Sequence, residues 1–213
     1  MPSFFLENTF LIKGFNVIAG IDEAGRGSWA GPVVAAAVVL DRTILCPTLA
    51  YTLNDSKKLS SGRREELLIA LRECADICVA IATVAEIDAS NILDATKLAM
   101  RRTVEGLEQK PDIVLIDGNH KPIIDCPAHC IIKGDEKCIS IAAASIVAKV
   151  SRDNIMKGLA PFFPGYGWES NAGYGTEKHK KSLYRLGITT EHRRSFKPIR
   201  KILGLESTQP QHI

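Results

Sequence analysis

An uninterrupted apolar run that ends in an acid and a glycine most constrains how this chain can fold. The run is Asp-Ile-Val-Leu-Ile-Asp-Gly at 112–118, and its apolar residues do not alternate with polar ones. A strand with one face in water alternates, whereas a strand covered on both faces is apolar throughout. The run therefore predicts a central strand with helices on both faces, the arrangement of an α/β protein.

The segments around this run alternate between strand and helix patterns. Short β-branched runs predict further strands over 17–21, 33–40 and 77–84. Apolar spacing predicts a helix over 63–75, one or two helices over 86–109, and a helix rich in small residues over 139–159. The 213 residues, 46% of them hydrophobic, are enough for one large domain or one domain with an extension.

Acids beside glycine mark three predicted strand ends. Asp22 and Glu23 follow the first strand, Asp117 ends the central run, and Asp135 ends an apolar segment at 131–135 that repeats the pattern. In an α/β sheet, functional sites gather where strands run out into loops. Four carboxylates there predict two divalent cations, since hard cations prefer oxygen ligands. Two such ions can drive phosphodiester cleavage.

The first pair of acids poses a geometric problem. Adjacent residues of a strand point to opposite faces, so Asp22 and Glu23 converge only if Glu23 leaves the strand. Gly25 and Gly27 can supply the turn, because glycine tolerates backbone conformations that other residues avoid. We therefore expect Glu23 to leave the strand there. A strand end with two exposed acids before a turn remains the alternative.

Charge is unevenly distributed along the chain. The net charge is +3, yet the segment 171–203 holds nine basic residues and two acids. A basic end on an otherwise acidic body indicates a polyanionic partner, while a solvated helical face explains the same charges. The longest apolar stretch, 30–40, is too short to cross a bilayer, so we expect no membrane span.

Six motifs follow one another in a recognisable order. They are Ile21–Gly27 with Gly31-Pro32-Val33, Asn54–Ser60, Ile116–Asn119, Lys133–Asp135, Ala143–Val150 with Arg152-Asp153, and Gly173–Thr176 with His179 and His192–Phe196. In this order the sequence resembles the type 2 ribonucleases H, the bacterial ribonuclease HII group, over about residues 17–200. The resemblance implies a ribonuclease H-like α/β fold, with a mixed β-sheet flanked by helices and a C-terminal basic helical extension.

The resemblance also implies an organisation of the chain. An N-terminal segment covers 1–16, the catalytic core 17–165, the helical extension of the same domain 166–203, and a flexible tail 204–213. The sister ribonuclease HIII group usually carries an additional N-terminal substrate-binding domain. Only about sixteen residues precede the first predicted strand here, so we expect the HII type.

Site residues are implied by the same motifs. The metal-binding and catalytic carboxylates are Asp22, Glu23, Asp117 and Asp135, holding two Mn²⁺ or Mg²⁺ ions with substrate bound. The implied substrate-binding residues are Gly25, Arg26, Gly27, Lys57, Ser145, Lys149 and Tyr174. The backbone of the Gly25–Gly27 loop is expected beside the 2′-hydroxyl, the group that separates RNA from DNA. Tyr174 is expected against the adjacent deoxyribose.

One position departs from the pattern. Family members often have proline and leucine after this loop, where Ser28 and Trp29 stand here. Trp29 is a packing residue or a stacking surface for nucleic acid. We favour packing, since large aromatic side chains usually belong to cores.

The implied function is that of a cytoplasmic, monomeric endoribonuclease in DNA replication and repair. It hydrolyses the RNA strand of RNA–DNA hybrids, and nicks ribonucleotide-containing duplex DNA 5′ of a single ribonucleotide, leaving 3′-hydroxyl and 5′-phosphate ends. A non-catalytic nucleic-acid-binding protein is the alternative. The four acids argue against it, because carboxylates repel phosphate unless metals intervene. A nucleotide-binding enzyme is disfavoured, since the glycine loop carries acids and lacks the lysine of a phosphate-binding loop.

Overall fold

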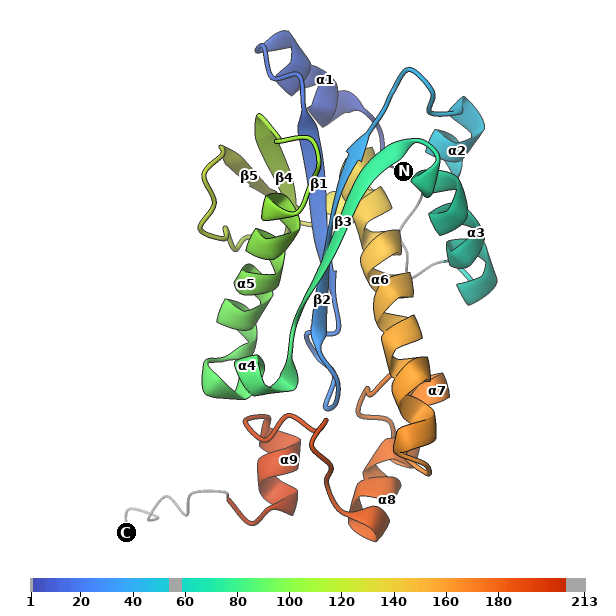
Figure 1. Ribbon diagram of the computed structural model, residues 1–213, viewed down its shortest axis with the longest axis vertical. Helices are drawn as coiled ribbons and strands as arrows, with labels where there is room; N and C mark the ends of the chain where they lie inside the picture. The colour runs from blue at the N-terminus through green and yellow to red at the C-terminus, as the bar shows by residue number, and fades with distance from the viewer. Residues whose placement is uncertain (1, 54–58, 206–213) are drawn as a thin grey trace.

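A mixed β-sheet between two layers of helices forms the body of the protein (Figure 1). The computed structural model describes residues 2–53 and 59–205. Within them the sheet has five strands in the order β3-β2-β1-β4-β5. The strands are β1 Ile18–Ala24, β2 Val33–Leu40, β3 Ala75–Ala82, β4 Ile113–Asp117 and β5 Ala128–Ile131. β1, β2 and β3 pair antiparallel, whereas β4 runs parallel to both β1 and β5.

Helices connect the strands and cover both faces of the sheet. In the first part of the chain they are α1 Phe5–Ile12, α2 Pro47–Thr52, α3 Ser61–Arg72, α4 Val84–Ala89 and α5 Ile92–Glu105. The second part adds the 3₁₀ turns η1 Gly134–Glu136 and η2 Ala160–Phe162, and the helices α6 Ile139–Leu159, α7 Trp168–Asn171, α8 Glu177–Leu186 and α9 Lys197–Ile202. None of the helices in the described ranges is long and apolar enough to span a bilayer.

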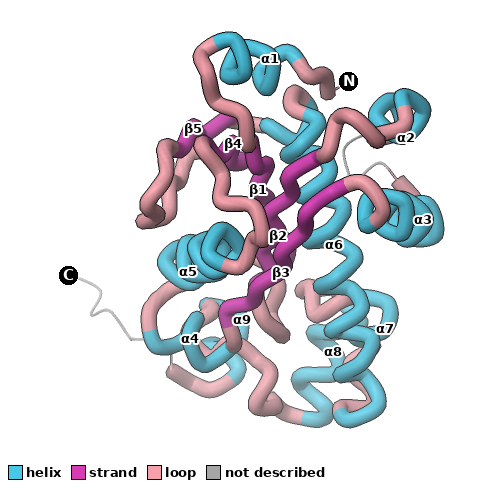
Figure 2. Tube along the Cα trace, turned by 45° about the horizontal axis from the view of Figure 1, so that its top comes forward, coloured by secondary structure: helices cyan, strands magenta, loops and turns pink. Residues whose placement is uncertain are grey.

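The two faces of the sheet are buried against different helices. α6 packs on β1 and β2 from one side, and α5 packs on β2 and β3 from the other (Figure 2). Alternation along β1 assigns its residues to these layers: Ala24 joins the core around α6, and Ile21 joins the core around α5. Asp22 therefore lies on the α6 face and Glu23 on the α5 face, a division that decides the geometry of the site.

α6 lies unusually close to β1. A Cβ atom added at Gly20 would stand 2.1 Å from the backbone carbon of Ser140 in the first turn of α6. The backbones can touch here only because Gly20 has no side chain. A run of fully buried alanines, Ala142–Ala144, continues the contact along α6. This close approach holds the later residues of α6 against the end of β1, where the acids lie.

The C-terminal elements lie at the end of the sheet where β1 runs out (Figure 1). They surround a separate buried cluster that includes Tyr166, Trp168, Leu183 and Ile199. A bridge between Ala30 and His192 joins this layer to the β1–β2 turn. The segment after α6 is thus packed against the β1–β2 turn.

Several predicted boundaries differ from the structure, which also decides between the one or two helices expected over 86–109. The strand expected through Asp135 ends at Ile131, because Lys133 takes a left-handed conformation with φ 55° and turns the chain into η1. The first strand continues to Ala24 instead of ending at residue 21. The region 86–109 forms two helices, α4 and α5, separated at Asn91, whose side chain caps α5 by accepting from the amide of Asp94.

Replacing Gly20 with alanine is expected to destabilise the fold. The new methyl group would overlap the backbone of α6, and overpacking a core typically costs about 1–3 kcal/mol. Urea unfolding of the variant should give a lower free energy of unfolding. Gly62→Ala is the matched control, because a Cβ atom at Gly62 meets nothing within 4 Å. Equal stability of both variants would contradict the close packing of α6 on β1.

Candidate active site

Two acids stand side by side at the ends of neighbouring strands. In the parallel pairing of β1 with β4, Ile21 is opposite Ile116, so the following residues Asp22 and Asp117 are adjacent on the α6 face. Asp22 is 6% exposed and accepts a 2.7 Å hydrogen bond from the amide of Glu23. The sheet register thus brings together two of the four acids predicted from sequence.

The environment of Asp22 disfavours a bare negative charge. Burial raises the pKa of this carboxyl well above its usual range, and the charges of Glu23 and Asp117 raise it further. Hydrogen bonds from the Ser145 side chain on α6 and from the backbone oppose the shift without reversing it. Clustered oxygen anions of this kind are matched to a hard cation, which would lower the pKa and restore the carboxylate.

Glu23 does not leave the strand, so this expectation was wrong. β1 continues through Glu23 to Ala24, and Glu23 therefore faces α5. Its Oε1 forms a 3.1 Å ion pair with Nη1 of Arg26. Glu23 and Asp117 both line a small pocket whose other walls include Lys97 of α5. The pocket shows that the two acids share the same end of the sheet despite starting on opposite faces.

Asp135 reaches the site from a turn. The amide of Gly134 donates a 2.6 Å hydrogen bond to Oδ1 of Asp117, which fixes η1 against the end of β4. Asp135, the next residue, is 4% exposed. Across the ranges that the structure describes, no three His, Cys, Asp or Glu side chains are arranged to hold a metal ion as they stand. The four acids share one end of the sheet, but they do not form a closed cage of ligands.

The glycine loop leaves β1 directly beside the acids. Gly25 has φ 93° and is buried, and a Cβ atom there would lie 1.8 Å from Nε of Arg152. Glycine is therefore required for both backbone conformation and space. Gly27 and Arg26 are exposed, and a Cβ atom at Gly27 meets nothing within 4 Å. The loop thus has a fixed base and an accessible tip.

Two buried arginines bind carbonyl groups of the β1–β2 turn, of which the glycine loop is the first part, and one of them also binds the loop before α8. Arg152 of α6 donates to the carbonyls of Pro32, Ala30 and Ala172 at 3.1, 3.1 and 2.8 Å. Arg193 donates to the carbonyls of Gly31 and Arg26 at 2.9 and 3.0 Å. Both are 0% exposed. In the sequence Arg152 stands out only as part of a motif and Arg193 only as one of nine basic residues in 171–203, so the structural role of both was missed.

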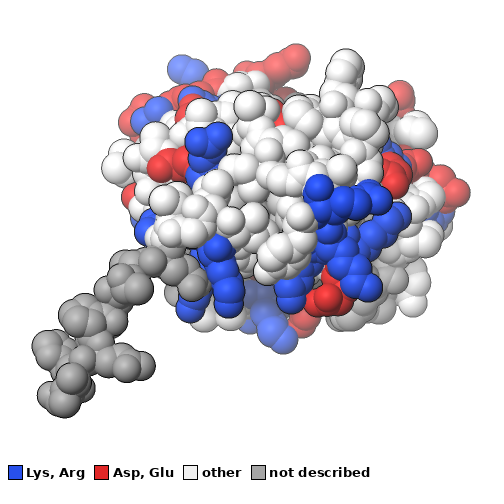
Figure 3. All heavy atoms as spheres, turned by 90° about the horizontal axis from the view of Figure 1, so that it is seen from below, with Lys and Arg blue, Asp and Glu red and all other residues white. Residues whose placement is uncertain are grey.

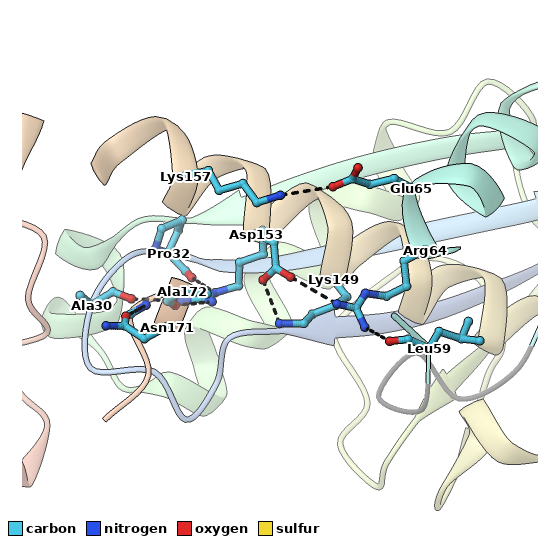
Figure 4. A network of polar contacts seen from close by, with 12 residues as sticks. Ala30, Pro32, Leu59, Arg64, Glu65, Lys149, Asp153, Lys157, Asn171 and Ala172 are labelled. Atoms are coloured by element: carbon cyan, nitrogen blue, oxygen red, sulfur yellow. Dashed lines mark hydrogen bonds and ion pairs between the residues drawn. The ribbon is translucent and has the colours of Figure 1, made fainter. Parts of the chain in front are cut away.

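Tyr174 lies half-buried where α6 meets the loop before α8. Nζ of Lys149 is 5.5 Å from the centre of its ring, and the guanidinium carbon of Arg152 is 5.3 Å from it. Lys149 also forms a 2.8 Å ion pair with Asp153, and Arg64 approaches the same carboxylate at 3.8 Å (Figure 4). Lys149 and Tyr174 are thus brought together, while Lys57 lies outside the described residues.

Trp29 packs in the protein. Its ring contacts Gly175 so closely that a Cβ atom added there would stand 2.1 Å from the ring. The centre of the Trp29 ring is 5.8 Å from that of His179.

Seen from below, Lys and Arg side chains gather in groups around this end of the molecule (Figure 3). Exposed basic residues of α8 and α9 are Lys178, Lys180, Lys181, Arg185, Lys197, Arg200 and Lys201.

A buried histidine pair was not predicted from the sequence. His179 is 0% and His192 is 1% exposed, and their Nε2 atoms are 3.1 Å apart. Burial lowers the pKa of His192 to about 3, with a further contribution from His179. Burial also lowers the pKa of His179. Their separation of thirteen residues gives no periodic signal, so only the fold reveals the contact.

Comparison with known proteins identifies relatives over nearly the whole chain. The family model described as Ribonuclease HII matches residues 19–199. Ribonuclease HII of Jannaschia sp. (strain CCS1) is 56% identical over 188 residues, which are 88% of this chain and 92% of that protein. Ribonuclease HII of Paracoccus denitrificans (strain Pd 1222) is 50% identical over 208 residues, 97% of each chain.

Solved structures show the same fold. The ribonuclease H2 from Pyrococcus horikoshii OT3 superposes with a TM-score of 0.74 at 26% identity, covering 88% of this chain and 97% of that one. A complex of Bst-RNase HIII with Mn²⁺ gives a TM-score of 0.72 at 24% identity, covering 89% and 70%. The predicted α/β fold with a ribonuclease H-like mixed sheet is confirmed. The basic helical extension and the domain boundaries remain predictions.

The buried histidines should make the fold sensitive to acid. His192 titrates near 6.5 in an unfolded chain and near 3 in the folded protein, so unfolding takes up a proton between these values. Stability present above pH 6.5 should be lost as the pH falls below it, by at most about 1.4 kcal/mol per pH unit for this group. Urea unfolding between pH 5 and 7 measures the slope.

His192→Gln removes the titrating group, and its unfolding free energy should depend less on pH over that range. His129→Gln, on the exposed surface of β5, is the control and should keep the wild-type slope. If His192→Gln keeps that slope as well, folding does not lower the pKa of His192.

Proposed function

The chain belongs to the ribonuclease HII family and is a ribonuclease H acting on RNA–DNA hybrids, and we propose that it also nicks duplex DNA 5′ of a single ribonucleotide by a two-metal mechanism. The observation that carries the proposal is the juxtaposition at the end of β1. Asp22 and Asp117 lie side by side, and the Gly25–Gly27 loop leaves the strand immediately after them. Metal-binding and sugar-reading groups are thereby adjacent.

The residues present suit hard divalent cations. Asp22, Glu23, Asp117 and Asp135 supply only oxygen ligands, and burial together with the charges of Glu23 and Asp117 raises the pKa of Asp22, which a bound cation would offset. The four acids would hold Mg²⁺ or Mn²⁺, as the related Bst-RNase HIII holds Mn²⁺. When bound, two such ions supply an activated water and charge stabilisation for the leaving oxygen. Arg26 would then compete with the metal for Glu23.

Recognition of the ribonucleotide falls to the glycine loop and to Tyr174. Gly27 presents bare backbone at the accessible tip of the loop, where amide and carbonyl groups can meet a 2′-hydroxyl. Tyr174 presents a half-exposed ring held near two cations. A ring packed on a deoxyribose tolerates DNA on the 3′ side of the cut and disfavours an additional hydroxyl. The exposed basic residues of α8 and α9 add sequence-independent attraction to phosphates.

Replacing Asp22 or Asp117 with asparagine should remove activity while hybrid binding survives. Each change removes metal-binding charge that the transition state needs, and an electrostatic loss of about 3–4 kcal/mol corresponds to 10²–10³ in rate. Cleavage of an RNA–DNA hybrid with Mg²⁺ or Mn²⁺ is measured alongside binding. Asp125→Asn, at an exposed position, is the control. A wild-type cleavage rate in Asp22→Asn would contradict the assignment of Asp22 as a metal ligand.

The position of the cut tests the proposed reading of sugars. A duplex with one ribonucleotide should be cut on its 5′ side, leaving 3′-hydroxyl and 5′-phosphate ends, and all-DNA should be inert. A site that hydrogen-bonds a hydroxyl can reject the analogue lacking it by about 10⁴–10⁵. Tyr174→Ala should slow cleavage of this duplex more than cleavage of a long hybrid. Gel mapping of both substrates measures this.

Tyr184→Ala is the control for Tyr174→Ala, because Tyr184 is an exposed tyrosine of α8. If Tyr174→Ala slows both substrates equally, Tyr174 does not read the junction. If the enzyme cuts only long hybrids, the single-ribonucleotide activity is refuted while hybrid cleavage stands.

A further inference from the structure

A chain of buried hydrogen bonds ends on the backbone of Tyr174. The amide of Thr189 donates to Nδ1 of His192 at 2.9 Å. The Nε2 atoms of His192 and His179 are 3.1 Å apart, and Nδ1 of His179 is 2.9 Å from the carbonyl oxygen of Tyr174. The chain spans three segments: the turn before residue 192, the start of α8, and the loop that carries Tyr174.

Two donors, the Thr189 amide at one end of the chain and the Trp168 indole beside its middle, fix which nitrogen of each ring carries hydrogen. The Thr189 amide can only donate, so Nδ1 of His192 holds a lone pair and its hydrogen is on Nε2. The Trp168 indole can only donate as well, and it lies 3.3 Å from Nε2 of His179, which is therefore an acceptor. The hydrogen of His179 is then on Nδ1 and points to Tyr174.

These two assignments were reached separately and agree at the contact between the rings. His192 donates from Nε2, and His179 accepts at Nε2. Both rings must be neutral for this to hold, since a protonated imidazole has donors on both nitrogens. The lowered pKa values of both rings match that requirement at neutral pH. Every bond in the chain then has one donor and one acceptor.

The contact with His179 acts on the C-terminal side of Tyr174. On the N-terminal side, Gly173 has φ 75° and its carbonyl already accepts from the amides of Trp29 and Ala30 at 2.8 and 3.3 Å. On the C-terminal side, Gly175 gives the backbone the freedom of glycine. The Tyr174 carbonyl accepts from the amide of Thr176 within the loop at 2.8 Å. The same carbonyl contacts Nδ1 of His179, which lies in α8. Without the His179 contact, the 174–175 peptide could take the other orientations that Gly175 allows, and Tyr174 would lose its fixed position on this side of the loop.

We propose that His179 and His192 are positioning residues that fix Tyr174 in the orientation needed to read the sugar beside a ribonucleotide. The inference rests on the proposed function of Tyr174. It assigns the histidines neither to phosphate contact nor to metal binding, since both are buried and their nitrogens are engaged with protein groups.

Two amide substitutions at residue 179 separate positioning from simple packing. In His179→Asn, the side-chain amide lies where Nδ1 was and can still donate to Tyr174. In His179→Gln, the amide lies near the position of Nε2, so contact with His192 is kept and the donor to Tyr174 is lost. The readout is the rate on a single-ribonucleotide duplex divided by the rate on a long hybrid, with circular dichroism confirming that each variant folds.

His179→Gln is expected to lower this ratio about tenfold or more, toward that of Tyr174→Ala, because misplacement of a substrate-positioning group is costly. His179→Asn should keep most of the wild-type ratio. In the double variant His179→Gln/Tyr174→Ala the ratio should fall no further than in Tyr174→Ala, since both changes remove the same contact. Equal ratios in the Asn and Gln variants would overturn the positioning role.

The outcomes distinguish this inference from the proposed function of Tyr174 on which it rests. An unchanged ratio in Tyr174→Ala refutes the reading role of Tyr174, and the role of the histidines falls with it. A lowered ratio in Tyr174→Ala with a wild-type ratio in His179→Gln refutes the histidine role alone. ¹⁵N NMR of the wild-type imidazoles provides a test without activity: His179 should be protonated at Nδ1 and His192 at Nε2, and the opposite pattern would overturn the inference.

Discussion

The parallel pairing of β1 with β4 is the constraint on which the site depends. It sets Asp22 beside Asp117, while hairpin pairing of β1 with β2 places the glycine loop at the same end. A shift of one residue in either strand would move one acid to the other face of the sheet. The contact of α6 at Gly20 then brings Ser145 to Asp22. The arrangement of these acids thus follows from the register of the sheet.

A second layer of organisation uses buried cations that donate hydrogen bonds to backbone carbonyl groups. Arg152 and Arg193 are surrounded by carbonyl groups from separate segments, and burial lowers the pKa of Arg193 to about 9. Burying a charge is costly unless hydrogen bonds replace water. Here Arg152 donates from all three nitrogens and Arg193 from Nε and Nη1 to loops that have no regular secondary structure to order them, while Nη2 of Arg193 is buried without a hydrogen-bond partner in the described ranges. These hydrogen bonds hold backbone segments that lie outside the helices and strands.

Sequence reasoning recovered what periodic patterns encode. The layered fold and the adjacency of Asp22 and Asp117 follow from apolar runs that end in acids. The expected position of Glu23 was wrong because the strand continues to Ala24 and the turn begins only at Gly25, two residues after Glu23. Charge counting could not separate Arg193, which is buried, from its exposed neighbours. Contacts such as that of His179 join distant segments, and no local spacing reports them.

The attachment of Arg193 to the glycine loop has a consequence for biosynthesis. Arg193 contacts carbonyls 162 and 167 residues earlier in the chain. Domains emerge from the ribosome in order from the N-terminus. A nascent chain can therefore pair β1 with β4, and so set Asp22 beside Asp117, before Arg193 has been made. The glycine loop gains this support only once residue 193 of 213 is in place, so the geometry of the loop is completed late in synthesis.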